Sequence, residues 1–208
     1  SVYIIAEMSA NHHQDFDRAI KIIHAAKKAG ADAVKLQTYS ADTMTIDCKK
    51  QHFFLKETIW KGSNLYELYS KAATPWEWHM DLKKEADKIG IDLFSTPFDF
   101  TAVDFLEKIQ IPVYKIASFE IVDIPLLKKV ATTGKPVILS TGMASLSEIE
   151  EAVENLKGAG CNESVLLKCT SAYPAPPEES NLRKIPQLAQ TFNLPSGISD
   201  HTMGSAIT

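Results

Sequence analysis

The amino-acid sequence predicts an α/β fold, a (β/α)8 TIM barrel of which this chain supplies about seven strands. Short apolar, strand-like runs alternate with amphipathic, helix-like runs along the chain, a pattern typical of parallel strands covered by helices. Polar residues follow nearly every strand at its carboxyl end, where a barrel enzyme carries its active site. The turn after the first strand, MSANHHQD, contains no glycine, which argues against an open sheet of the dinucleotide-binding type.

The expected strands are runs of branched and aromatic residues bounded by loops. They cover residues 2–9, 33–39, 92–98, 112–118, 136–142, 164–174 and 196–201. Residue parity on the second strand places Lys35, Gln37 and Tyr39 on one face. The same parity turns Leu36 and Thr38 toward the outer helices.

Helices are expected between consecutive strands, where apolar residues recur every three or four positions. They cover residues 15–30, 74–90, 100–110, 123–133, 145–160 and 181–192. Ser145 and Glu148 have the spacing of a capping box at the start of their helix. Thr74, Pro75 and Glu77 form a similar pattern, so we expect the helix over 74–90 to begin there.

The composition is that of a globular domain with one hydrophobic core. Of the 208 residues, 45% are hydrophobic and 23% charged, and the formal net charge is -4. A mildly acidic chain without a run of Lys or Arg gives no reason to expect nucleic acid or a membrane as a partner. Cys48, Cys161 and Cys169 form no CxxC pair, so we expect free thiols in a reducing cytoplasm. The opening VYIIA run is too short for a signal peptide or a membrane span.

A closed barrel needs an eighth strand, and the repeat of strand and helix stops after the strand at 196–201. We therefore expect residues 1–208 to be a TIM-barrel catalytic domain, truncated before strand eight, within a longer polypeptide. Such a chain would expose the edges of its first and last strands. Produced alone, it is expected to aggregate, pair through those edges or stay partly molten.

Seven sequence blocks, one near each strand end, are together more informative than any single motif. They are IIAEMSANH, VKLQTY, FSTPFD, YKIASFE, ILSTGM, LLKCTSAYPAP and GISDHT. These blocks resemble the sialic acid synthase family, barrel enzymes that condense phosphoenolpyruvate with an N-acetylated sugar aldehyde to give a nonulosonic acid and phosphate. The variants AEMSANH and KCTSAYPAP look more like the pseudaminic acid synthase branch than the N-acetylneuraminate or legionaminate branches.

The resemblance implies a set of phosphoenolpyruvate ligands at the strand ends. They are Lys35, Thr96, Lys115, Ser118, Ser171 and Ser199. Lysines and hydroxyls suit a substrate that carries a phosphate and a carboxylate, because both anions accept hydrogen bonds from cations and O–H groups. Lys115 and Ser118 have opposite parity, so one of them must lie beyond the regular strand.

The resemblance also implies catalytic and sugar-binding residues. Glu120 matches the carboxylate that handles water and protons when water attacks carbon two of phosphoenolpyruvate. Glu7 matches a second catalytic carboxylate on the sugar side. Gln37, Asn64 and Tyr173 match positions beside the acceptor sugar.

A divalent metal, Mn²⁺ or Mg²⁺, is the cofactor that the resemblance implies. His201 matches the first of two metal-binding histidines, and the second belongs to the eighth strand. Imidazole suits such an ion, which polarises a carbonyl as a Lewis acid. The family also appends a small antifreeze-like domain that lends an arginine to the partner subunit's site, so a homodimer is expected for the full-length protein.

Other interpretations of the same residues stay open. A barrel lysine can form a Schiff base, which would make the protein an aldolase. A sugar- or phosphate-binding barrel fragment without turnover is a third class. Cys169 could join His201 as a thiolate ligand, although filling a layer of the core is the simpler role for it.

Overall fold

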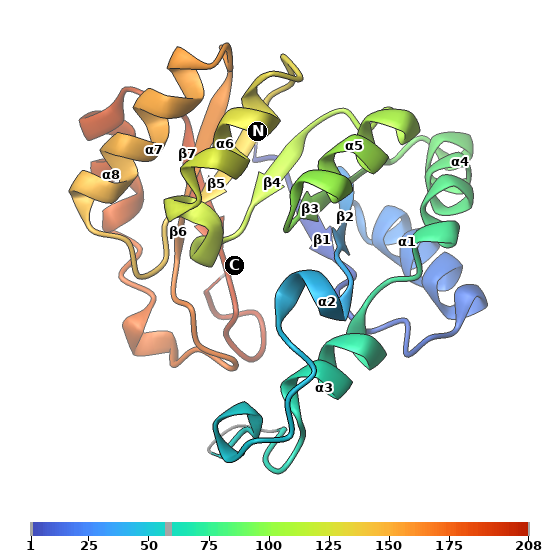
Figure 1. The fold of residues 1–208 in the computed structure, drawn as a ribbon. Helices are drawn as coiled ribbons and strands as arrows, with labels where there is room; N and C mark the ends of the chain where they lie inside the picture. Colours follow the sequence, from blue (N-terminus) through green and yellow to red (C-terminus); the bar gives the residue numbers. More distant parts are fainter. Residues whose placement is uncertain (1, 57–59, 208) are drawn as a thin grey trace. The chain divides into compact units, whose positions relative to one another are not determined.

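The computed structural model describes residues 2–56 and 60–207 (Figure 1). The chain forms two compact units, residues 1–112 and residues 113–208. Parallel strands alternate with helices in each unit, as the sequence predicts. Within the described residues, no helix combines the length and the apolar character that crossing a membrane requires.

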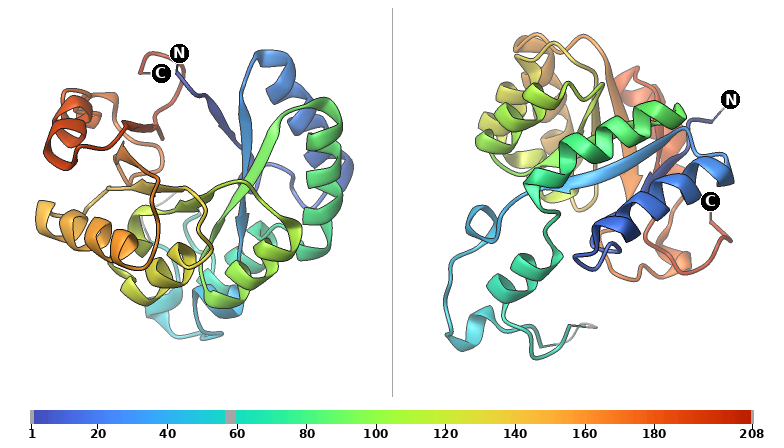
Figure 2. Two further views of the ribbon diagram at one scale, coloured as in Figure 1. Left: turned by 90° about the horizontal axis from the view of Figure 1, so that it is seen from above. Right: turned by 90° about the vertical axis from the view of Figure 1, so that its right-hand side faces the viewer.

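The first unit contains three parallel strands that pair in chain order, β1 with β2 and β2 with β3. The strands are β1 (Ile5–Glu7), β2 (Ala33–Thr38) and β3 (Asp92–Pro97). The helices are α1 (Phe16–Ala29), α2 (Ala41–Met44), α3 (Leu65–Ala72), α4 (His79–Ile89) and α5 (Phe100–Ile109), with short 3-10 turns η1 (Gln51–Phe53) and η2 (Trp76–Trp78). Helices α1, α4 and α5 lie along one face of these strands (Figure 2).

Helix α1 shows how the sequence positions this layer. The Asp15 side chain accepts a hydrogen bond from the Arg18 amide and caps the helix, and Gly30 ends it in the left-handed region with φ of 89°. Its buried face packs in one apolar cluster with Leu36 of β2 and Leu82 of α4. The prediction that Leu36 faces the outer helices is therefore confirmed.

The predicted single helix over 74–90 is wrong at its start. Residues 76–78 form the 3-10 turn η2, and α4 begins only at His79. The Thr74 hydroxyl does not cap a helix, because it lies 3.1 Å from Nε2 of the buried His12. A buried imidazole requires a hydrogen-bond partner, and that tertiary demand overrides the local capping pattern.

The second unit contains four parallel strands, which also pair in chain order. They are β4 (Tyr114–Ile116), β5 (Val137–Ser140), β6 (Ser164–Cys169) and β7 (Ser196–Ser199). The helices are α6 (Ile124–Ala131), α7 (Leu146–Gly158) and α8 (Lys184–Phe192), with 3-10 turns η3 (Ser118–Val122) and η4 (Pro177–Glu179).

Two details of the second unit bear on the predictions. The capping box of Ser145 and Glu148 is present at the start of α7, as predicted. Helix α8 begins at Lys184 rather than at residue 181. Asn181 has a positive φ of 46°, a left-handed conformation that no regular right-handed helix contains.

Candidate active site

In the first unit, the structure brings together Glu7, Lys35 and Thr96 at the carboxyl ends of β1, β2 and β3. Glu7 and Lys35 are register partners and form an ion pair, in which the lysine side chain is 14% exposed. Lys35 Nζ also lies 3.4 Å from the hydroxyl of the buried Thr96. Gln37 pairs in register with Thr96. This arrangement holds a cation between a carboxylate and a hydroxyl.

Asn64 has a structural role in the same unit. Its side-chain oxygen accepts hydrogen bonds from the backbone amides of Tyr66 and Glu67 and so caps α3. Its amide nitrogen donates to the carbonyl of Cys48 at 2.8 Å, and the residue is 3% exposed. Both polar ends of this buried side chain serve the loop itself, so we leave Asn64 out of the proposed sugar site.

In the second unit, Lys115 lies on β4 and is only 4% exposed. Its ammonium donates to the Ile116 carbonyl at 2.7 Å and to the Ser140 hydroxyl on β5 at 2.6 Å. The opposite parity of Lys115 and Ser118 required one of them to lie beyond the strand. That residue is Ser118, which opens the 3-10 turn η3 after β4. A buried cation favours the binding of an anion, because an anion compensates its charge.

Gly142, two residues after the end of β5, was missed by reasoning from the sequence. Its backbone amide donates to the Ser118 hydroxyl at 3.2 Å. A Cβ added there would lie 2.3 Å from the Ser171 hydroxyl oxygen and 2.7 Å from that of Ser118. Only glycine therefore allows these two hydroxyls to converge on the chain. The signal available in the sequence was the glycine that follows the strand in ILSTGM.

Glu120 lies in η3, and its Oε2 atom is buried without a hydrogen-bond partner among the described residues. Burial raises the pKa of this carboxyl, while the charge of Lys115 opposes part of that effect. A carboxyl that is partly desolvated and has an unsatisfied oxygen is well suited to exchange a proton with a bound reactant.

His201 follows β7 and packs against Tyr173, with the two rings stacked at a centroid distance of 4.2 Å. Its Nδ1 atom lies 3.1 Å from the Thr170 carbonyl, which can only accept, so Nδ1 carries the proton. Nε2 is then the acceptor and lies 3.3 Å from the Tyr173 hydroxyl. Metal-binding histidines usually have their second nitrogen fixed by a carbonyl in this way.

Cys169 lies beside His201 and pairs in register with Ser199 of β7. Its sulfur is 4.0 Å from His201 Nδ1 and 3.9 Å from the Ser171 hydroxyl. Burial by itself raises the pKa of this thiol, but hydrogen bonds from His201, Ser118 and Ser171, together with the charge of His201, lower it to about 7. Cys169 is 8% exposed, so it fills the interior as the simpler interpretation expects, in polar surroundings.

The fit to a divalent metal is tested on His201, the ligand that the resemblance implies. Within the described residues, no three or more His, Cys, Asp or Glu side chains gather as a metal-binding group. His201 nevertheless has the tautomer of a ligand, with its lone pair on Nε2, which the Tyr173 hydroxyl contacts at 3.3 Å. The imidazole therefore fits the role of one metal ligand, although no complete set of three such ligands gathers within the described residues.

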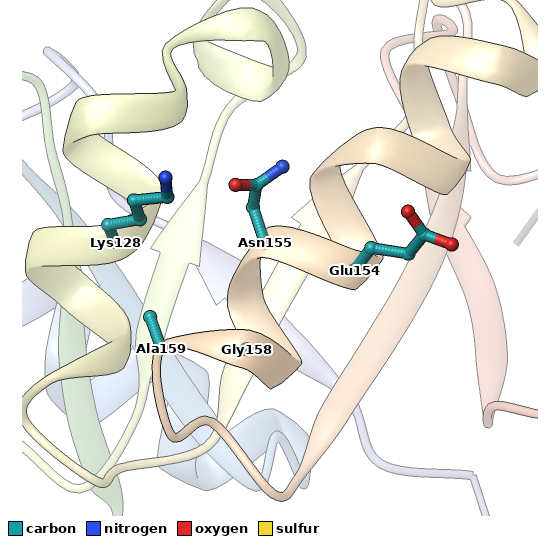
Figure 3. Close-up of a pocket in the computed structure, with 5 residues that line it drawn as sticks. All are labelled: Lys128, Glu154, Asn155, Gly158 and Ala159. Atoms are coloured by element: carbon teal, nitrogen blue, oxygen red, sulfur yellow. The ribbon is translucent and has the colours of Figure 1, made fainter.

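A surface pocket of the second unit lies apart from these residues (Figure 3). It opens between α6 and α7 and is lined by Lys128, Glu154, Asn155, Gly158 and Ala159. The Asn155 amide donates to a backbone carbonyl of its own helix, that of Glu151. None of the predicted site residues lines this pocket, so it gives no support to the predicted chemistry.

Known proteins resemble the chain along nearly its whole length. It is 47% identical to pseudaminic acid synthase of Helicobacter pylori over 202 residues, which are 97% of this chain and 59% of that protein. It is 42% identical to N,N'-diacetyllegionaminic acid synthase of Campylobacter jejuni, covering 99% of this chain and 62% of that protein. The chain thus spans about three fifths of the length of these relatives.

A solved structure supports the same relationship. The crystal structure of N-acetylneuraminic acid synthetase from Leptospira borgpetersenii, in complex with citrate, matches with a TM-score of 0.88 at 35% identity. The match covers 99% of this chain and 67% of that protein. The predicted barrel fold class is confirmed by this match and by the alternating parallel strands and helices. Since the NeuB family model matches residues 22–208, the chain belongs to the NeuB family.

Proposed function

We propose that this chain belongs to a synthase that condenses phosphoenolpyruvate with an N-acetylated amino-sugar aldehyde, releasing phosphate. The product would be a nonulosonic acid, and the identities of 44–47% to named pseudaminic acid synthases favour pseudaminic acid. The observation that carries the proposal is the cluster in the second unit, where buried Lys115 lies near Ser140 and Gly142 brings two serine hydroxyls together.

The residues at the strand ends would bind the two anionic groups of phosphoenolpyruvate. In the second unit, Lys115, Ser118 and Ser171 offer an ammonium and two hydroxyls, and Ser199 adds a further hydroxyl at the end of β7. In the first unit, Lys35 and Thr96 offer the same chemistry. Charge-assisted hydrogen bonds of this kind are about twice as strong as neutral ones, which suits a substrate with two anions.

Glu120 would handle the proton of the attacking water. In the overall reaction, carbon three of phosphoenolpyruvate attacks the aldehyde carbon, the aldehyde oxygen takes up a proton to become a hydroxyl, water adds to carbon two, and phosphate leaves. The water must lose a proton as it adds, and a buried carboxylate with a raised pKa is a suitable acceptor. Glu7, paired with Lys35, is proposed as the second carboxylate on the sugar side.

A divalent metal, Mn²⁺ or Mg²⁺, would polarise the aldehyde carbonyl when bound. His201 would be one of its ligands through Nε2, with the Thr170 carbonyl holding the proton on Nδ1. Tyr173 is proposed to leave Nε2 and face the acceptor sugar, together with Gln37. The metal role of His201 rests on the geometry of its imidazole, and the roles of Gln37 and Tyr173 rest on their places in the sequence blocks that resemble the family.

The compartment and the assembly are proposed on narrower grounds. Cys48, Cys161 and Cys169 are free thiols, which supports a reducing, cytoplasmic compartment. Assembly of the full-length protein as a homodimer stays a prediction.

Phosphate release by the full-length protein tests the proposal. With phosphoenolpyruvate, Mn²⁺ and a panel of N-acetylated amino-sugar aldehydes, we expect release only when an acceptor is present. Omitting the sugar is the control for simple hydrolysis of phosphoenolpyruvate. A covalent adduct trapped by borohydride would identify a Schiff-base aldolase instead. Binding of phosphoenolpyruvate without release for any acceptor would favour a binding module.

A further inference from the structure

Lys168 has an unusual position at the end of β6. Among the described residues, it and Lys115 are the buried lysines, and Lys168 is 8% exposed. Its ammonium donates to the Thr170 hydroxyl and, at 3.1 Å, to the carbonyl of Glu179 in η4. Burial is the largest cause of a lowered pKa of this lysine. A lysine desolvated in this way needs a structural or functional reason.

The Glu179 carbonyl is the centre of this arrangement. It accepts hydrogen bonds from Lys168 Nζ, from the Thr170 hydroxyl at 3.0 Å and from the Asn181 amide at 3.0 Å. These contacts join the two ends of the loop over residues 170–179. We call Lys168, Thr170, Glu179 and Asn181 the loop clasp.

The loop clasp is connected to His201 through the backbone carbonyl of Thr170. Lys168 and Thr170 are two residues apart and share a side of the chain, so the clasp fixes the Thr170 side chain away from Cys169 and Ser171. The backbone carbonyl of Thr170 is the acceptor of His201 Nδ1. Tyr173, which stacks on His201, belongs to the same loop. The clasp therefore constrains Thr170 and Tyr173, two of the residues that contact the imidazole.

From this geometry we infer that Lys168 is a positioning residue, which acts through the Thr170 carbonyl to hold His201 in the tautomer with a proton on Nδ1. The ammonium links the Thr170 hydroxyl to the Glu179 carbonyl, so the loop keeps one backbone conformation. Nε2 is then the only ring nitrogen with a lone pair. The inference rests on the proposed function only where it concerns metal binding, because the tautomer is a property of the metal-free protein.

The tautomer can be measured directly by ¹⁵N NMR of the imidazole ring in metal-free, full-length protein. In the wild type we expect the ring shifts of the tautomer protonated on Nδ1. In Lys168→Met we expect the shifts of a mixture of tautomers, and Mn²⁺ affinity reduced about 10-fold, the lower end for loss of an outer partner. Lys168→Arg keeps a charged donor and should restore most of the wild-type tautomer.

Matched variants separate positioning from general damage. Lys157→Met removes a lysine from the exposed side of α7 and should leave the tautomer unchanged. If Lys168→Met does not fold, Thr170→Val tests the same link, since it removes the hydroxyl and keeps the carbonyl. Circular dichroism and phosphoenolpyruvate affinity within about twofold of wild type would show an intact barrel.

The outcomes distinguish this inference from the proposed function. An unchanged tautomer in both Lys168→Met and Thr170→Val would overturn the inference, whatever the activity of the wild type. A changed tautomer supports it even if the wild type binds no Mn²⁺ and releases no phosphate, a result that would instead refute the proposed function. A wild type already protonated on Nε2 would also overturn it.

Discussion

Glu120 has a buried oxygen that no described residue satisfies, beside the charge of Lys115. An enzyme gains from such a carboxyl when a reactant supplies the missing partner. Replacing Glu120 with glutamine keeps the size of the side chain and removes the carboxyl group that can gain and lose a proton. We expect Glu120→Gln to bind phosphoenolpyruvate nearly as wild type and to lose about 10²–10⁴-fold in kcat, the usual loss of general acid–base help.

Stopped-flow and steady-state phosphate release would measure this effect in the full-length protein. Glu178→Gln, which replaces an exposed carboxylate of η4, is the control and should keep the wild-type kcat. A kcat of Glu120→Gln within a few-fold of wild type would remove Glu120 from the mechanism.

Gly142 gives a second prediction at the scale of single residues. The added methyl of Gly142→Ala would meet the tips of two serine hydroxyls, which can rotate away without disturbing the backbone. We therefore expect the variant to fold and to bind phosphoenolpyruvate about 1–3 kcal/mol more weakly, because a hydrogen-bond donor to the anion is displaced. Isothermal titration calorimetry would measure this change.

Gly158→Ala is the matched control, since its added Cβ would meet nothing within 4 Å. This glycine lies at the end of α7, where alanine also favours the helix. Equal affinity of Gly142→Ala and wild type would show that the two hydroxyls do not contact the anion.

At the scale of elements, a buried polar network joins α4 to β2 and β3. Nε2 of His79 lies 2.9 Å from the Thr38 hydroxyl, which lies 2.6 Å from the Ser95 hydroxyl. Burial lowers the pKa of His79 to about 4. Thr38 faces α4 as its parity predicted, so the network fixes the register of helix against strand.

The lowered pKa makes this network sensitive to acid. Between pH 6.5 and pH 4 the unfolded chain binds a proton that folded His79 does not, so stability rises with pH in this range. The contribution is complete above the unfolded pKa and falls by up to about 3 kcal/mol as the pH drops to 4. Urea denaturation at several pH values would measure it.

His79→Gln should be less stable near neutral pH and should show a flatter dependence of stability on pH. His52→Gln changes an exposed histidine and should reproduce the wild-type slope. If the slopes of wild type and His79→Gln coincide between pH 4 and 6.5, His79 does not remain neutral in the folded state.

At the scale of the whole molecule, the edge of β1 is the feature with the clearest consequence. Within the described part of the first unit, β1 pairs only with β2. Val2 and Ile4, which precede it, are 82% and 55% exposed. An apolar strand edge of this kind templates pairing with another chain. We expect the 208-residue chain produced alone to self-associate as its concentration rises.

Sedimentation velocity would measure this self-association. Ile4→Lys places a charge at the edge and should shift the chain toward monomer, because lysine blocks edge pairing. Ile46→Lys is the control, since Ile46 is 64% exposed and lies outside the strands. Monomeric behaviour of the unsubstituted chain at all concentrations would exclude the edge as a contact.

The sequence by itself determined the alternation of strands and helices, the cap of α7 and the faces of β2. Each depends on residues two to four positions apart, so the chain encodes it locally: Ser145 with Glu148, and Leu36 with Thr38. The family followed from whole blocks at the strand ends, which the match over residues 22–208 confirmed.

Only the tertiary structure decided which groups meet. The approach of Gly142 to Ser118 and the clasp of Lys168 on Glu179 join residues from different segments of the chain, and the Thr74–His12 contact replaced a predicted cap. Such contacts depend on strand register and on where a chain turns after its strand. Residue spacing carries no record of them, because pairing between distant segments is fixed by packing.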